Sequence, residues 1–130
     1  AQNREPGSVI NIQEARNERF ISMRRGHGVR ALQDRIFYEN RMSPRILMET
    51  GSPEGARRLA IVCNAVTLFP ETLMNIGVTD ADRGGGWFGI EGNQYLRDFF
   101  LCHRKNSYLP RYTQDFIEAT QRFFAGLGAY

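Results

Sequence analysis

Residues 45–70 read RILMETGSPEGARRLAIVCNAVTLFP. The stretch opens with the apolar run 46–48 and closes with the largely apolar run 65–69, and each run is typical of a short strand. Between the two runs, Ser52 is a preferred helix N-cap and Pro53 suits the first helical position. Apolar side chains then recur at helical spacing, namely Ala56, Leu59, Ala60, Val62 and Cys63. The stretch therefore predicts a strand, a helix and a second strand, which form a βαβ unit.

The residues before this stretch continue the same alternation. Residues 20–23 have the composition of a buried strand, and the loop RRGHG at residues 24–28 leads into a helix at residues 29–40. The apolar face of this helix comprises Val29, Leu32, Ile36 and Phe37, and its polar face comprises Arg30, Gln33, Asp34, Arg35 and Glu39. Pro44 lies just beyond the helix and prevents its continuation. The pattern predicts an α/β fold, with a Rossmann-like open parallel sheet and helices on both faces.

Shorter patterns predict the elements in the rest of the chain. We expect residues 1–8 to form a linker or a disordered terminus, and residues 75–83 to form a loop. We expect an edge strand or entry segment at residues 9–12 and a helical turn at residues 13–18. Two strands are expected at residues 87–90 and 95–104, and a final helix at residues 111–124. The aromatic-rich apolar stripe of the final helix comprises Tyr112, Phe116, Ile117, Thr120, Phe123 and Phe124.

Composition limits the classes of protein that fit the chain. Its 130 residues suffice for one domain or two small lobes, and its net charge of +3 comes from sixteen arginines and one lysine dispersed among acids. This dispersal argues against a nucleic-acid-binding surface, which requires a basic patch. No apolar run is long enough to cross a bilayer, and no signal-peptide pattern opens the sequence. Cys63 and Cys102 are interpreted as reduced core cysteines of a cytoplasmic protein rather than as a disulfide.

Two turns are the candidates for a binding site. The loop 24–28 and the turn 50–54 each follow a predicted strand and precede a predicted helix, so they should lie together at the carboxyl edge of the sheet. Backbone N–H groups, hydroxyls and guanidinium groups at this edge would suit a small carboxylate or phosphate. The candidate ligand-binding residues are Arg24, Arg25, Gly26, Thr50, Gly51 and Ser52. The alternative is that Ser52 only caps its helix and that both arginines are solvated.

The sequence offers little support for catalysis. His27 and His103 lack a third residue at metal-ligand spacing, and neither a dinucleotide-binding fingerprint nor a P-loop occurs. We therefore expect no catalytic residue, no metal site and no cofactor. His27 is interpreted as a surface or hydrogen-bonding residue, with a general base as the alternative.

Two long segments resemble a known family. The chain is similar to the second lobe of the effector-binding domain of LysR-type transcriptional regulators at residues 20–73, which read FISMRRGHGVRALQDRIFYENRMSPRILMETGSPEGARRLAIVCNAVTLFPETL. It resembles the closing strand and final helix of that domain at residues 95–124, which read YLRDFFLCHRKNSYLPRYTQDFIEATQRFF. The resemblance implies an effector-binding domain fragment at residues 9–130, with the second lobe at 9–92 and the return strand and helix at 93–130.

The resemblance also implies a fold like that of type 2 periplasmic binding proteins, no enzymatic activity, and a bacterial, cytoplasmic regulator that forms dimers or tetramers. A small effector would bind between two lobes. Its implied contacts are Arg25, Gly26, Thr50, Gly51 and Ser52. The helix-turn-helix domain that binds DNA and most of the first lobe have no counterpart here, so we expect a fragment. The family's glycine-rich segment before the proline reads CNAVT at residues 63–67, without either glycine.

These observations support one leading hypothesis and two alternatives. The leading hypothesis is an effector-sensing regulatory domain that binds a small metabolite, expected to be anionic, and couples it to oligomer geometry and transcription control. The first alternative is a lobe of a solute-binding protein for a small anion, and the second is a small α/β enzyme that uses His27. Without its usual lobe, the helix at residues 111–124 should expose apolar surface that self-association or another chain would cover.

Overall fold

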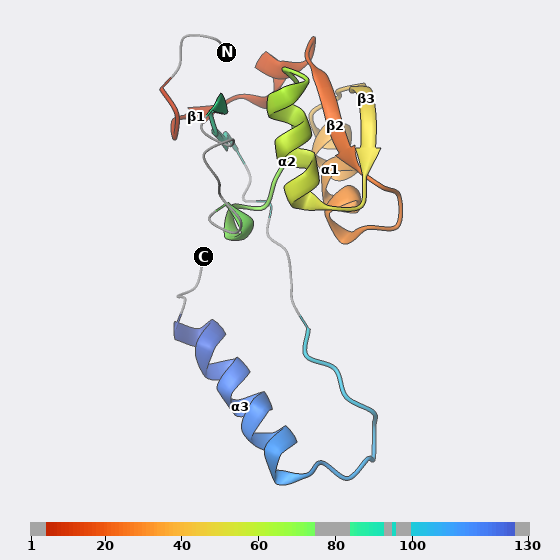
Figure 1. Ribbon diagram of the computed structural model, residues 1–130, viewed down its shortest axis with the longest axis vertical. Helices are drawn as coiled ribbons and strands as arrows, with labels where there is room; N and C mark the ends of the chain where they lie inside the picture. Colours follow the sequence, from red (N-terminus) through yellow and green to blue (C-terminus); the bar gives the residue numbers. More distant parts are fainter. Residues whose placement is uncertain (1–4, 75–83, 93–94, 96–99, 127–130) are drawn as a thin grey trace. The chain divides into compact units, whose positions relative to one another are not determined.

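The computed structural model of the chain describes residues 5–74, 84–92, 95 and 100–126. The loop predicted at residues 75–83 lies outside these ranges. The chain divides into two compact units, Ala1–Tyr95 and Leu96–Tyr130, which we call unit 1 and unit 2 and describe separately. In chain order the elements, with η for a 3₁₀ helix, are β1 (Val9–Ile10), η1 (Ile12–Ala15), β2 (Arg19–Met23), α1 (Gly28–Glu39), β3 (Arg45–Thr50), α2 (Pro53–Val62), η2 (Glu71–Leu73), β4 (Gly89–Ile90) and α3 (Arg111–Gly126) (Figure 1).

Strand β2 is the centre of unit 1. It runs parallel to β3, with Met23 opposite Thr50 at the carboxyl end, and Val66 forms a further parallel bridge with Phe20. Helices α1 and α2 cover opposite faces of this sheet (Figure 1). The predicted α/β fold with parallel strands and helices on both faces is therefore confirmed.

The side chains of β2 alternate between two clusters of buried residues. The cluster on the α1 side comprises Ile12, Ala15, Phe20, Ile36, Phe37 and Met42. The cluster on the α2 side comprises Ile21, Met23, Val29, Ala56 and Ala60. Because both faces of β2 are covered, Phe20, Ile21 and Met23 are each only 1% exposed. Burial of side chains of this size stabilises the folded state by about 2 kcal/mol each.

A polar contact ties β2 to α1 within this core. Gln33 of α1 is 2% exposed, and its Oε1 accepts hydrogen bonds from the Ser22 hydroxyl at 2.8 Å and from the Met23 N–H at 2.9 Å. Its Nε2 donates to the Leu68 carbonyl at 2.9 Å. The prediction that Gln33 and Arg30 lie on the polar, solvent-facing side of the helix is wrong, since both are buried with partners for their polar atoms.

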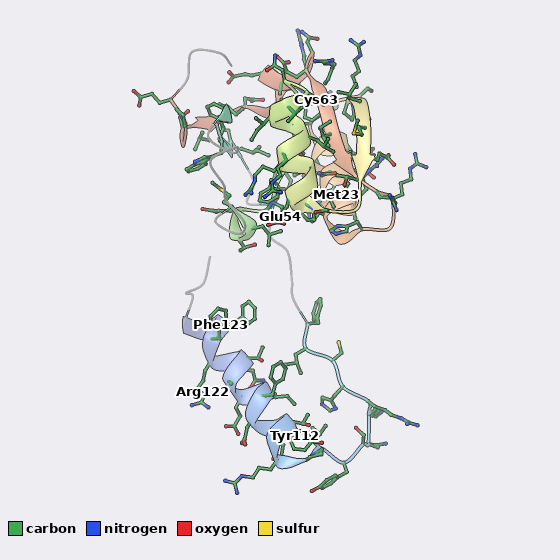
Figure 2. All side chains as sticks on the ribbon, in the orientation of Figure 1. Met23, Glu54, Cys63, Tyr112, Arg122 and Phe123 are labelled. Carbon is green, nitrogen blue, oxygen red and sulfur yellow. The ribbon has the colours of Figure 1, made fainter. Side chains whose placement is uncertain are left out.

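Side-chain caps start both helices of unit 1. Ser52 Oγ accepts a hydrogen bond from the Gly55 N–H at 3.1 Å, and Pro53 is the first residue of α2, as predicted. The N-cap of α1 is His27, whose Nδ1 accepts a hydrogen bond from the Val29 N–H at 3.1 Å. Glu54 and Cys63 mark the two ends of α2 in Figure 2.

The third predicted strand, at residues 65–69, is reduced to the single bridge at Val66. The Val66 carbonyl accepts a hydrogen bond from the Ile21 N–H at 2.8 Å. Farther along, the Leu68 carbonyl accepts from the Gln33 side chain rather than from a strand. The Leu68 carbonyl is thus satisfied by a side chain instead of by a neighbouring strand, and the strand pairing does not continue beyond Val66.

The remaining strands are shorter than predicted. β1 pairs in parallel with β4, and each strand contributes two residues to the pair. The sequence predicted longer segments, at residues 9–12 and 87–90. Of the strand predicted at residues 95–104, the described residues 95 and 100–104 form none, and the others lie outside the described ranges.

Three side chains of the predicted core are more exposed than expected. Val62 was placed on the apolar face of α2 but is 82% exposed, because it lies on the side of the helix away from Ala56 and Ala60. Both cysteines are free, but Cys63 is only half-buried and Cys102 is exposed. Neither is a core residue.

Helix α3 in unit 2 carries an exposed apolar stripe. Tyr112 is 76% exposed, Phe116 66% and Phe123 62%, and the labelled side chains of Tyr112 and Phe123 project from the helix in Figure 2. The prediction of exposed apolar surface on this helix is confirmed for these residues. Among the described residues, no helix has the length and apolar character that a membrane span needs.

Replacing Gln33 by methionine removes its hydrogen bonds and nearly preserves its size. We expect Gln33→Met to lower the free energy of unfolding by about 3 kcal/mol, because the Met23 N–H, the Ser22 hydroxyl and the Leu68 carbonyl would be buried without partners. Urea denaturation followed by circular dichroism measures the difference. The matched control on the same helix is Tyr38→Met, at a side chain that is 84% exposed, and it should change stability by less than about 0.5 kcal/mol. Equal effects would contradict the role assigned to Gln33.

Candidate functional site

The two predicted turns meet at the carboxyl edge of the sheet. Met23 and Thr50, the last residues of β2 and β3, are directly paired, and the Arg24 N–H donates to the Thr50 carbonyl at 2.8 Å. The loop that begins at Arg24 and the turn that begins at Thr50 are therefore adjacent, as expected for neighbouring parallel strands.

The loop after β2 exposes two guanidinium groups. Arg24 and Arg25 are exposed, and neither forms an ion pair within the described residues. Gly26 has a φ of 88°, in the left-handed region where residues with side chains are strained. The loop ends at His27, which is fixed by its cap on α1. The backbone of the loop is thus held at both ends while its two cations face solvent.

The turn after β3 uses much of its own hydrogen-bonding capacity. Thr50 Oγ1 accepts from the Ser52 N–H at 3.2 Å, and Ser52 Oγ accepts from the Gly55 N–H at 3.1 Å. The expectation that this turn offers free N–H groups to a ligand is therefore wrong for Ser52, whose N–H is already bound to the Thr50 hydroxyl. Each hydroxyl still has a proton to donate. Ser52 is a helix cap, and any ligand contact is additional to that role.

An open pocket lies beside the loop and extends over the start of α1. Its volume is about 240 Å³, and it is lined by Arg25, Gly26, His27, Gly28, Arg30, Ala31 and Asp34. Two of the predicted site residues, Arg25 and Gly26, line it. The other four, Arg24, Thr50, Gly51 and Ser52, do not. The hollow therefore lies on the α1 side of the loop, and the turn before α2 stands outside it.

Arg30 joins the start of this loop to β3. Its Nη1 donates to the Met23 carbonyl at 2.8 Å and to Glu49 Oε1 at 2.5 Å, and its Nε donates to Asp34 Oδ1 at 2.8 Å. The hydrogen bonds to Glu49 and to Asp34 raise the pKa of Arg30 above its ordinary value. Arg30 is only 8% exposed and its guanidinium group is already bound to two carboxylates and a backbone carbonyl, so it acts as a structural cation in the lining of the pocket.

The same contacts set the charge at this edge of the sheet. The hydrogen bond from Arg30 lowers the pKa of Glu49, and the positive charges of Arg25 and Arg24 lower it further. Glu49 therefore remains ionised and offsets part of the positive charge. Because Arg30 is already bound to two carboxylates, Arg24 and Arg25 are the cations that a ligand at this edge would meet.

Three features of the candidate site were not predicted from the sequence. They are the contacts of Arg30, its pairing with Glu49, and the capping of α1 by His27. One signal was available. Ser22 interrupts the apolar run of β2, and a hydroxyl in a strand buried on both faces requires a polar partner from a neighbouring helix. That reasoning would have placed a polar face of α1 against β2.

The described residues do not assemble a catalytic or metal centre. No group of three or more His, Cys, Asp or Glu side chains is placed to hold a metal ion in the part of the chain that the structure covers. His27 Nδ1 is engaged by the Val29 N–H, in line with its interpretation as a hydrogen-bonding residue.

Comparison with known proteins identifies the family. The sequence matches the family model of the LysR substrate binding domain over residues 3–125. The chain belongs to this family. Its members are domains of regulators and not enzymes, so the resemblance and the expectation of no enzymatic activity are confirmed.

A solved structure shares the fold. The chain is similar to the effector binding domain of QuiR in complex with shikimate, with a TM-score of 0.72 and 19% sequence identity. The match covers 95% of this chain and 57% of that chain, so the protein spans little more than half the length of the solved domain. The predicted fold, like that of type 2 periplasmic binding proteins, is confirmed. No curated protein gives a significant sequence match.

Glu49→Gln tests the ion pair through its pH dependence. Because the folded-state pKa of Glu49 is lowered, the pair stabilises the fold above the ordinary value of 4.5, and this contribution is lost as the pH falls through the lowered value. We expect the wild type to melt at a higher temperature than Glu49→Gln at neutral pH, and the difference to shrink on acidification below pH 4.5.

Thermal unfolding of both proteins over a pH series measures this difference. The pKa of Glu39 is also lowered, by Arg35, but Glu39 titrates in both proteins and cancels from the comparison. A difference that stays constant into strong acid would mean that the pair does not stabilise the fold.

Proposed function

We propose that the chain is the effector-sensing regulatory domain of a bacterial LysR-type regulator, and that it binds a small anionic metabolite at the carboxyl edge of the sheet. The proposed contacts are Arg24, Arg25, Gly26, Thr50, Gly51 and Ser52. The observation that carries the proposal is the pairing of Met23 with Thr50, which brings the two turns together. Two exposed guanidinium groups and two hydroxyls thereby reach one edge.

The charge and geometry of this edge favour a carboxylate. A guanidinium group can form two parallel hydrogen bonds to a carboxylate, and the hydroxyls of Thr50 and Ser52 retain protons to donate. The similar QuiR domain was solved with shikimate, which is a small carboxylate. We extend to this protein the chemical class of that ligand, and shikimate itself is the first compound to test.

In the intact regulator, this edge would face the first lobe across the effector site. Ligand-linked movement of the lobes would shift the population among oligomer geometries and so change contacts with DNA. Those contacts would be made by the helix-turn-helix domain of the full-length regulator, which would act in the cytoplasm. The division into a second lobe at residues 9–92 and a return strand and helix at residues 93–130 remains part of this proposal.

Removing one cation and one hydroxyl tests the site. Calorimetry of the full-length regulator with shikimate, other small carboxylates and inorganic phosphate would first find a ligand. We expect Arg25→Ala combined with Ser52→Gly to weaken its binding by about 3 kcal/mol, or about a hundredfold, because a charge-assisted contact and a hydroxyl contact are lost. Glycine is chosen at position 52 because it preserves most of the helix-cap stability, which alanine would not.

The matched control for this double variant is Arg45→Ala. Arg45 is exposed at the opposite end of β3, so its loss should leave the affinity unchanged. Circular dichroism must show that both variants are folded. An affinity of the double variant equal to that of the wild type would exclude the proposed site.

The exposed stripe on α3 predicts that the chain associates with itself or with another chain. In light scattering at high concentration, the isolated chain should show a mass above that of one copy. Tyr112→Ser combined with Phe116→Ser should lower this mass, because the two side chains are one helical turn apart on the stripe and are both exposed. Gln121→Ser, on the same helix but off the stripe, is the control. A strict monomer at high concentration would contradict self-association.

A further inference from the structure

Tyr95, the last residue of unit 1, is bound to the C-terminal end of α1. Its half-buried side chain packs against the buried cluster on the α1 side of β2. Its hydroxyl oxygen accepts a hydrogen bond from Asn40 Nδ2 at 3.2 Å. The guanidinium carbon of Arg35 lies 5.5 Å from the centre of its ring, within the range of a cation–π contact. Three kinds of contact thus hold one side chain.

A carboxylate fixes the cation of this contact. Glu39 accepts a hydrogen bond from Arg35 Nε at 2.9 Å, and this bond lowers the pKa of Glu39. Arg35, Glu39 and Asn40 thus lie together at the C-terminal end of one helix, where Arg35 and Asn40 contact Tyr95 and Glu39 holds Arg35. We call these three residues and Tyr95 the Tyr95 clamp.

The partners of Tyr95 are themselves held in place. Asn40 Nδ2 also donates to the Ile36 carbonyl at 2.8 Å, and the Asn40 carbonyl accepts a hydrogen bond from the Gln13 side chain. Asn40 is therefore fixed both to its own helix and to η1.

The boundary between the two units follows directly after the clamp. Unit 1 ends at Tyr95 and unit 2 begins at Leu96. We propose that Tyr95 is a positioning residue, which anchors on the C-terminal end of α1 the point from which the chain continues into unit 2. The anchor narrows the range of arrangements open to the two units, because the chain leaves unit 1 from a fixed place.

The anchor also gives α1 a second role, which rests on the proposed function. The N-cap of the helix is His27, the last residue of the proposed effector loop, and its C-cap is Asn40, within the clamp. One helix therefore follows directly on the proposed effector loop at its start and holds the exit of the chain at its end. A displacement of α1 by a ligand would be passed to the start of unit 2.

The chain's two native cysteines allow the anchor to be tested without ligand. Cys63 belongs to unit 1 and Cys102 to unit 2, both are free, and the sequence contains no other cysteine. Nitroxide labels on the two thiols report the distribution of distances between the units by double electron–electron resonance. We expect Tyr95→Ser to broaden this distribution or shift its maximum. The control is Tyr38→Ser, which removes an 84% exposed tyrosine from α1 and should leave the distance distribution unchanged.

Each outcome of this experiment decides the proposal. A distribution for Tyr95→Ser that superimposes on the wild type would overturn it, and so would equal broadening in Tyr38→Ser. If Tyr95→Ser does not fold, as judged by circular dichroism, the deciding variant is Tyr95→Phe combined with Arg35→Gln. That pair keeps the buried ring and removes the hydroxyl and the guanidinium, so an unchanged distribution would again overturn the proposal. No ligand is present, so the result does not depend on whether the effector site is correct.

Discussion

Residues 20–23 of β2 are buried on both faces of the strand, and this constraint places the other elements of unit 1. A parallel strand between two helices must have each of its side chains matched from one side or the other. Its apolar residues are matched by the two buried clusters, but Ser22 needs a polar partner, and Gln33 supplies it. The same amide binds the Met23 N–H, while Arg30 binds the Met23 carbonyl. The end of β2 is thus fixed from α1, and the loop with the two exposed arginines starts from that fixed point.

The elements that the sequence predicts correctly are those set by neighbours along the chain. Ser52 and Pro53 start α2 by local capping, and the apolar spacing of α1 correctly identifies Val29, Ile36 and Phe37 as buried. Hydrophobic periodicity fails at Gln33 and Arg30 because it scores a side chain by its own polarity and ignores partners from another strand. It fails at residues 65–69 for a related reason, since the Gln33 side chain of α1 donates a hydrogen bond to the Leu68 carbonyl there, in place of a neighbouring strand.

The same distinction applies to the candidate site. The adjacency of the two turns follows from parallel topology, so the sequence alone could predict it. The pocket over α1 and the occupied N–H groups of Ser52 and Gly55 depend on where individual side chains lie, which no pattern of residue types encodes. The absent family glycines are a third case. Asn64 adopts the left-handed conformation after α2, with a φ of 48°, and asparagine tolerates this region better than most residues do. The backbone turn that a glycine would favour is therefore kept without one.

The pairing of β1 with β4 has a consequence for the order in which unit 1 assembles. From β2 to Val66, the paired segments follow one another along the chain, so their loops close at a small cost in conformational entropy. β1 instead joins Val9 to Gly89 through a ladder of two residues, and so closes nearly the whole length of the unit. We infer that the segment from β2 to Val66 folds first, and that β1 docks last and detaches first. Amide hydrogen exchange would resolve this order, and slower exchange in β1 than in β2 would refute it.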